Sequence, residues 1–118
     1  MVWQEKIWGK VWHLFQSDRS SVSFLEVKKG FQSSRHFHRE RANLFAVISG
    51  RIKIRVWDQD GEPLWERDLD SGQTCVVGSN LVHQFQVLES GQVIEVYWPD
   101  GKVMFGDIVR LDEGGPMK

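Results

Sequence analysis

The chain has 118 residues, of which 41% are hydrophobic and 26% are charged, and its formal net charge is −1 at pH 7. This composition is typical of one globular domain and unlike that of a disordered chain. The small net charge gives no field that would gather nucleic acid or anionic lipid. No apolar run is long enough for a signal peptide or a membrane span, so we expect a cytoplasmic protein. Cys75 is the single cysteine, which excludes an internal disulfide, and we expect it to be a buried small residue.

Apolar residues alternate with other residues in short runs along the chain. The runs contain Val22 and Phe24, then Ile52, Ile54 and Val56, then Ile94 and Val96. A period of two predicts half-buried strands. Turn signals separate the runs: Lys29-Gly30, Ser49-Gly50, Asp60-Gly61, Asp70-Ser71-Gly72, Ser90-Gly91 and Asp100-Gly101. This spacing predicts an all-β barrel or sandwich built from hairpins.

We expect a single domain over residues 1–118, with its core at about residues 20–105. The segment 1–19 carries Trp3, Trp8 and Trp12, which could cover an open sheet edge or form a dimer contact, while most other aromatic rings fill the core. The segment 106–118 is expected to be a short tail. Within it, Asp107 to Leu111 forms either a final strand or one helical turn, and residues 113–116 are expected to fray.

Three of the four histidines have positions that suit one metal ion. His36 and His38 are separated by one residue in an expected strand, so their side chains share a face, and their imidazoles start about 6 to 7 Å apart. From there both can converge on one ion. His83 begins another strand-like run, which a barrel can bring against the first pair. His13 has no partner at ligand spacing, and we expect a structural or surface role for it.

Two segments around these histidines resemble the two motifs of the cupin family. The matching positions of the first motif are Gly30, His36, His38, Asn43 and Gly50, and those of the second are Gly72, Gly78, Asn80 and His83. Cupins have glutamate where this chain has Asn43, and usually have proline and glycine at Gly78 and Asn80. The resemblance implies a cupin barrel, also described as a double-stranded β-helix or jelly roll.

A closer resemblance is to the cupin domain of bifunctional (type II) mannose-6-phosphate isomerases, over about residues 5 to 113. Glu5-Lys6-Ile7-Trp8-Gly9 resembles the opening Glu-Lys-Pro-Trp-Gly of that family, and Asp107-Ile108-Val109-Arg110 resembles its Asp-Ile-Val-Arg. That family has Gln-x-His where this chain has His36-Phe37-His38. Its Tyr-Gly-Arg, after the Ile-Val-Arg segment, is replaced here by Glu113-Gly114-Gly115.

The predicted site is therefore one divalent metal ion, which could be zinc, iron, manganese or nickel, held by His36, His38 and His83. Asn43 either adds a fourth ligand through its amide oxygen or hydrogen-bonds a ligand histidine or a strand end. Three neutral imidazoles without a carboxylate leave the ion a good Lewis acid.

An isomerase also needs a base within reach of its substrate. Glu95 and Tyr97 are the acid–base candidates, although alternation with Ile94 and Val96 favours a solvent-facing Glu95. Arg35 and Arg41 are candidates to bind a substrate phosphate or carboxylate, or else pair with Glu40 or lie exposed.

Three functions fit these residues. The first is a metal-dependent enzyme acting on a small polar metabolite, most plausibly a sugar-phosphate isomerase of the mannose-6-phosphate isomerase kind. The second is an iron dioxygenase with three histidine ligands. The third is a non-catalytic cupin that binds a sugar or another metabolite. By analogy with cupins that pair through an outer sheet, we expect a homodimer. We expect no nucleic acid or membrane partner.

Overall fold

The computed structural model describes residues 3–99 and 108–117, which form eleven strands in one curled sheet. In chain order these are β1 (Trp3–Lys6), β2 (Gly9–Gln16), β3 (Ser21–Val27), β4 (Phe31–Gln32), β5 (His36–His38), β6 (Arg41–Trp57), β7 (Pro63–Leu69), β8 (Thr74–Val77), β9 (Val82–Pro99), β10 (Ile108–Arg110) and β11 (Gly115–Pro116). The described residues contain no helix, so the all-β prediction is confirmed. The predicted turn at Asp100-Gly101 lies outside these residues.

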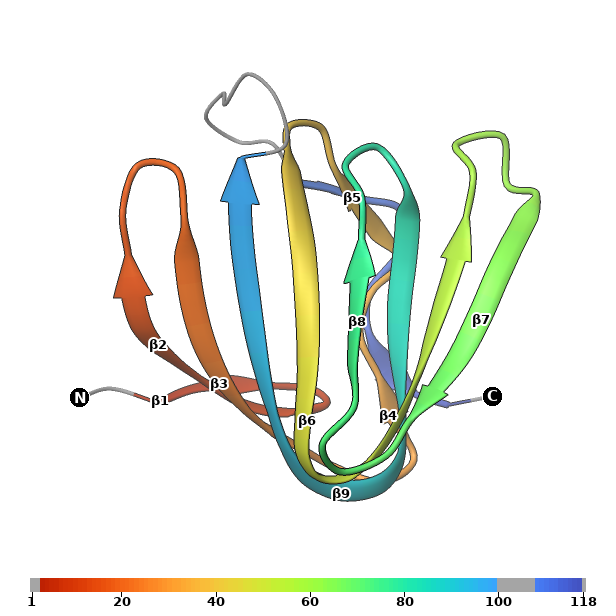
Figure 1. The fold of residues 1–118 in the computed structure, drawn as a ribbon. Helices are drawn as coiled ribbons and strands as arrows, with labels where there is room; N and C mark the ends of the chain where they lie inside the picture. The colour runs from red at the N-terminus through yellow and green to blue at the C-terminus, as the bar shows by residue number, and fades with distance from the viewer. Residues whose placement is uncertain (1–2, 100–107, 118) are drawn as a thin grey trace.

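The two longest strands, β6 and β9, are the frame of the barrel. They pair antiparallel from Arg41 opposite Pro99 to Trp57 opposite Val82. Both strands bend where the register shifts between Val47 and Ile52, and Figure 1 shows the two arms that result. A Cβ at Gly91 would lie 2.0 Å from the Ser49 carbonyl oxygen, so this close approach requires glycine.

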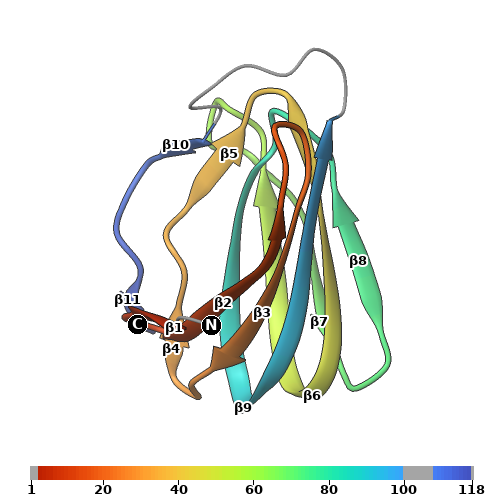
Figure 2. The ribbon, with the colours of Figure 1, turned by 90° about the vertical axis from the view of Figure 1, so that its left-hand side faces the viewer.

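Each arm of the β6–β9 pair extends into one wall of the barrel. In one wall, β8 pairs with β6 while β3, β2 and β1 follow on the other side of β9. In the other wall, β7 pairs with β6 while β4 and β5 pair with β9. The two walls face each other, as Figure 2 shows from the side. The space between them holds both the apolar core and the site.

The apolar core lies between the walls. Alternate residues Ile52, Ile54 and Val56 of β6 are at most 1% exposed, as their spacing predicts, and they pack with Phe45 and Phe85. Cys75 is buried in the same cluster, which confirms its expected role. The structure describes no helix long and apolar enough to cross a membrane.

Of the tryptophans near the amino terminus, Trp8 packs against this core, with its ring centroid 5.0 Å from that of Phe85, whereas Trp3 and Trp12 lie outside it. Trp3, Trp12 and Phe24 gather on the outer face of β1, β2 and β3, with ring centroids 5.0 to 6.4 Å apart. The half-buried Ile94 lies opposite Phe24 on the same face. Ser21, Ser23 and Leu25 are buried at the inner positions of β3. Because side chains alternate along a strand, the apolar Phe24 lies on the outer face of this wall.

The carboxyl-terminal segment, residues 108–117, lies beside β4 and β5, and we call it the strap. β10 pairs antiparallel with β5, which decides for a final strand over a helical turn at residues 108–110; Asp107 lies outside the described residues. The prediction that residues 113–116 fray is wrong, because β11 pairs with β4 and the Met117 amide donates to the Gly30 carbonyl at 2.7 Å. Backbone hydrogen bonding in the strap thus satisfies groups that a frayed tail would leave to water.

Phe45→Ala tests the position of the core. Phe45 is 1% exposed, and truncating a buried phenylalanine leaves a cavity, so we expect the free energy of unfolding to fall by about 3 to 5 kcal/mol. Urea denaturation of chelator-treated protein measures this change. The matched control is Val76→Ala on the exposed outer face, where we expect a change below about 0.5 kcal/mol. Equal effects of the two substitutions would contradict this core.

Candidate metal centre and its cavity

The structure brings His36, His38 and His83 together. His36 and His38 extend from the same side of β5, and His83, near the start of β9, lies directly opposite His36. The ring centroids of His36 and His83 are 4.4 Å apart, and one ligand atom from each histidine lies within 4.8 Å of the others. All three side chains are buried. This is the arrangement that the sequence predicts for a metal ion.

Hydrogen bonds to the backbone fix two of these imidazoles. Nδ1 of His36 donates to the Ser34 carbonyl at 2.9 Å, and Nδ1 of His83 donates to the Leu81 carbonyl at 3.0 Å. Each ring therefore keeps its proton on Nδ1 and presents the lone pair of Nε2 to the cluster. Nε2 of His83 is buried and has no hydrogen-bond partner in the part of the chain that the structure describes. A metal ion would give this atom the partner that a buried polar atom requires, so the residues fit the predicted metal.

Burial keeps His36 and His83 neutral at pH 7. Burial lowers the pKa of His83 to about 4. Burial also holds the pKa of His36 well below its ordinary value, and the nearby His83 and His38 lower it further. Metal ligation requires an unprotonated imidazole nitrogen. At neutral pH these two rings are therefore already in the form that binds a metal.

A cavity of about 470 Å³ extends from the histidines to the polar inner faces of β3 and β9. Glu95 and Tyr97 line it together with His36 and His38. The solvent-facing position favoured for Glu95 is wrong, because Glu95 and Tyr97 point inward while Ile94 and Val96 lie on the apolar outer face. Alternation correctly shows that the two polar residues share a face. It fails to show which face is inside, because the interior is polar here.

Glu95 and Tyr97 form a hydrogen-bonded pair in this cavity. Desolvation raises the pKa of Glu95 to about 7, and hydrogen bonds with Tyr97 and Asn43 and the charge of Arg41 partly oppose this rise. Burial raises the pKa of Tyr97, and the neighbouring Glu95 carboxylate raises it further. The Tyr97 and His38 ring centroids are 4.7 Å apart. Tyr97 therefore lies between the acidic residue and the histidine cluster.

Asn43 is fully buried on β6, opposite Tyr97. Its Nδ2 donates to the carbonyls of Val96 and Leu44, at 3.4 and 3.5 Å, and its side chain also hydrogen-bonds Glu95. Asn43 thus contacts the acidic residue and backbone carbonyls within β6 and β9, a role that was not predicted for it. Within the described residues its Oδ1 is buried without a hydrogen-bond partner, and its role as a fourth ligand stays a prediction.

The two arginines predicted to contact substrate differ in position. Arg41 lines the cavity, with its guanidinium 4.9 Å from the centroid of the Tyr97 ring. Arg35 is held outside by Asp112 of the strap, with 2.5 Å between Nε and Oδ2, and its guanidinium lies 5.7 Å from the Trp57 ring. The acidic partner of Arg35 is Asp112 and not Glu40. The geometry therefore favours Arg41 over Arg35 as a substrate contact.

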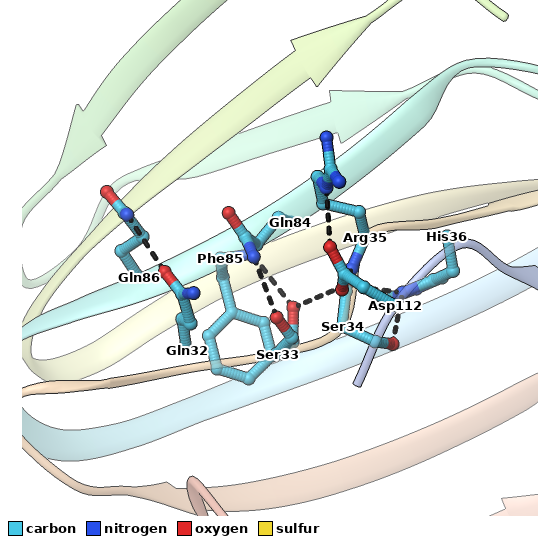
Figure 3. A network of polar contacts seen from close by, with 9 residues as sticks. All are labelled: Gln32, Ser33, Ser34, Arg35, His36, Gln84, Phe85, Gln86 and Asp112. Carbon is cyan, nitrogen blue, oxygen red and sulfur yellow. Dashed lines mark hydrogen bonds and ion pairs between the residues drawn. The ribbon is translucent and has the colours of Figure 1, made fainter. Parts of the chain in front are cut away.

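The contacts that the strap and the serines beside His36 make at the cavity were not predicted from the sequence. Arg110 of β10 lines the cavity and donates to Oγ of Ser34 at 3.1 Å. Figure 3 shows that Ser33 makes polar contacts with Gln84 and Phe85 of β9, that Ser34 contacts His36, and that Arg35 contacts Asp112. The Ile108-Val109-Arg110 match was the one signal in the sequence for Arg110. His13 lies exposed at the same cavity, where Nδ1 is 3.0 Å from Oγ of Ser23, as a surface role predicts.

Comparison with solved structures identifies the fold. The capsular polysaccharide assembling protein CapF from Staphylococcus aureus superposes over 94% of this chain and 34% of its own, with a TM-score of 0.76 and 18% identity. Oxalate decarboxylase OxdC from Bacillus subtilis superposes over 93% of this chain and 30% of its own (TM-score 0.75, 21% identity). KdgF from Halomonas sp. superposes over 86% of this chain and 89% of its own, with a TM-score of 0.69 and 17% identity. The chain thus spans about a third of CapF and of OxdC.

These similarities show that the chain has the cupin fold, as predicted. At these identities the likeness defines the fold alone. No protein-family model and no curated protein sequence matches the chain. The narrower resemblance to mannose-6-phosphate isomerases stays a prediction.

His83→Ala tests the metal centre. Removing one of three ligands should abolish stable binding, so we expect about one metal ion per chain in the wild type and none in the variant. Elemental mass spectrometry on untagged protein, before and after incubation with zinc, iron, manganese or nickel, measures this content. The control is His13→Ala, which should load like the wild type. A wild type that loads no metal, or a His13→Ala variant that loses it equally, would contradict the assignment.

Proposed function

We propose that the protein binds one divalent metal ion through His36, His38 and His83 and acts on a small polar metabolite in the adjoining cavity. When bound, such an ion supplies Lewis acidity to a substrate oxygen. Manganese is a reasonable first metal to test beside zinc, iron and nickel, since the related oxalate decarboxylase has Mn(II) centres. We also propose that the protein is cytoplasmic, as its sequence predicts.

We propose further that the reaction is a proton transfer between neighbouring carbons, as in sugar-phosphate isomerases of the mannose-6-phosphate isomerase kind. One observation carries this proposal: Glu95 lines the same cavity as the histidines and has a pKa of about 7. A base of this pKa can take a proton from a carbon next to a carbonyl and return it to the neighbouring carbon. Tyr97 donates a hydrogen bond that orients the Glu95 carboxylate.

A second candidate function is an iron dioxygenase. The group of potential ligands in the described residues consists of three histidines without a carboxylate, and this set suits ferrous iron with open positions for substrate and dioxygen. The isomerase is preferred because an acid–base pair faces the same cavity, which a dioxygenase does not require. A non-catalytic metabolite-binding cupin is the third candidate and needs neither the pair nor turnover.

Glu95→Gln tests the proton transfer. With mannose 6-phosphate as the probe, we expect kcat/KM to fall by about 10² to 10⁴, because the amide cannot accept the proton. The wild-type kcat/KM should rise with pH through about 7 and then level off, since only the ionised carboxylate is a base. Incorporation of solvent deuterium into the product reports the same step directly. Metal content should not change.

The control for this experiment is Glu66→Gln on β7, an exposed carboxylate paired with Arg55. A Glu95→Gln variant as active as the wild type would reject the assigned base. Oxygen consumption by the ferrous protein, without deuterium exchange, would favour the dioxygenase. Binding of sugar phosphates without either reaction would favour the non-catalytic cupin.

We also propose that two copies pair through the apolar outer face that contains Trp3, Trp12, Phe24 and Ile94. The neighbouring Val96 lies on this face, and Val96→Glu should therefore separate the copies, because burying an unpaired carboxylate is costly. Light scattering should give about twice the 13.7 kDa chain mass for the wild type and one chain mass for the variant. Leu64→Glu, at an exposed position on β7, is the control and should remain dimeric. A monomeric wild type would contradict the proposal.

A further inference from the structure

Arg110 is an exposed residue that lines the cavity beside the histidine cluster. In the pairing of β10 with β5, Arg110 lies directly opposite His36, and paired residues of antiparallel strands project from the same face of the sheet. Nη1 of Arg110 donates to Oγ of Ser34, and this oxygen lies 3.2 Å from Nδ1 of His36. The guanidinium is therefore anchored at one nitrogen, next to a predicted metal ligand.

Among the described residues, no acidic side chain neutralises the charge of Arg110. Arg35 is paired with Asp112 and Arg55 with Glu66, whereas no carboxylate within residues 3–99 and 108–117 lies at ion-pair distance from Arg110. A guanidinium has five N–H donors, and the Ser34 contact uses one of them. Arg110 thus has donors for a ligand in the cavity.

The positive charge of Arg110 acts on both sides of the cavity. Burial is the main cause of the low pKa of His36, to which the charge of Arg110 adds a smaller lowering, and the same charge opposes part of the rise that burial causes in the pKa of Tyr97. Arg41 contributes a second guanidinium at the Tyr97 ring. Three acidic residues of the described chain line the cavity: Asp112 is paired with Arg35, Glu113 is exposed, and burial raises the pKa of Glu95 to about 7, so that part of it is uncharged at neutral pH. The interior therefore favours an anion between the histidines and the acid–base pair.

We propose that the cavity binds the oxyanion group of its ligand, a carboxylate or a phosphate, through Arg110. A planar guanidinium can donate two parallel hydrogen bonds to such a group, and a site beside the histidines lets the rest of the same molecule reach the metal. The proposal defines the substrate class for the proposed function and rests on that function for the metal. It does not depend on which reaction follows.

The test is titration calorimetry with sodium acetate and with inorganic phosphate as separate probes. Each is titrated into manganese-loaded and into chelator-treated protein, for the wild type, Arg110→Gln and Arg110→Lys. The glutamine can keep the hydrogen bond to Ser34 without the charge, and we expect about tenfold weaker binding of the preferred oxyanion, as loss of a charge-assisted hydrogen bond implies. The lysine keeps the positive charge but cannot donate two parallel hydrogen bonds from a planar group. Phosphate binding should therefore survive better than acetate binding. Arg55→Gln is the control and should bind like the wild type.

The outcomes separate this inference from the proposed function. A wild type that loads manganese but binds neither probe, or an Arg110→Gln variant that binds both probes unchanged, overturns the inference and leaves the metal centre standing. A wild type that loads no metal overturns the proposed function, and Arg110-dependent binding to that protein would still support the inference. If Arg110→Gln does not fold, an Arg110→Lys variant with undiminished affinity for both probes overturns the bidentate contact.

Discussion

The antiparallel pairing of β6 with β9 is the interaction on which both the fold and the site depend. In one arm of this pair, Phe45 lies opposite Glu95, and in the other, Val56 lies opposite His83. The same two strands thus supply the acidic wall of the cavity, the apolar layer beneath it and one of the three histidines. Because both arms belong to one continuous ladder, the register of β6 against β9 fixes Glu95 and Tyr97 relative to the histidine cluster.

The sequence was sufficient to predict the strands and the histidine cluster. Period-two alternation is a local property, and it identified Ile52, Ile54 and Val56 as the inner face of their strand. The pairing of His36 with His38 on one face follows from the same periodicity. The position of His83 opposite them depends on how distant strands pair. The cupin resemblance predicted this pairing, whereas periodicity could not.

The sequence was insufficient where the interior is polar and where strands pair at long range. Alternation groups Glu95 with Tyr97, but the usual rule that the apolar face is buried assigns them to solvent, and a polar cavity reverses that rule. The strap is a second example. Its Arg110 reaches the cavity through pairing of β10 with β5, a contact between segments far apart in the chain, and through the serine hydroxyl at position 34.

The polar side chains on the inner wall of the cavity lower the free energy of unfolding, and the fold itself does not require them. The pKa of Glu95 is raised from 4.5 to about 7, so the folded chain retains its proton to higher pH than the unfolded chain does. The stability of the fold therefore falls as pH rises between these two values, and at neutral pH an apolar residue at position 95 would avoid this loss. Ser21 and Ser23 are buried on the same inner surface, at positions where apolar side chains would add to the core. Groups with shifted pKa values that reduce stability are typical of functional sites, and the proposed binding and acid–base roles would account for these residues.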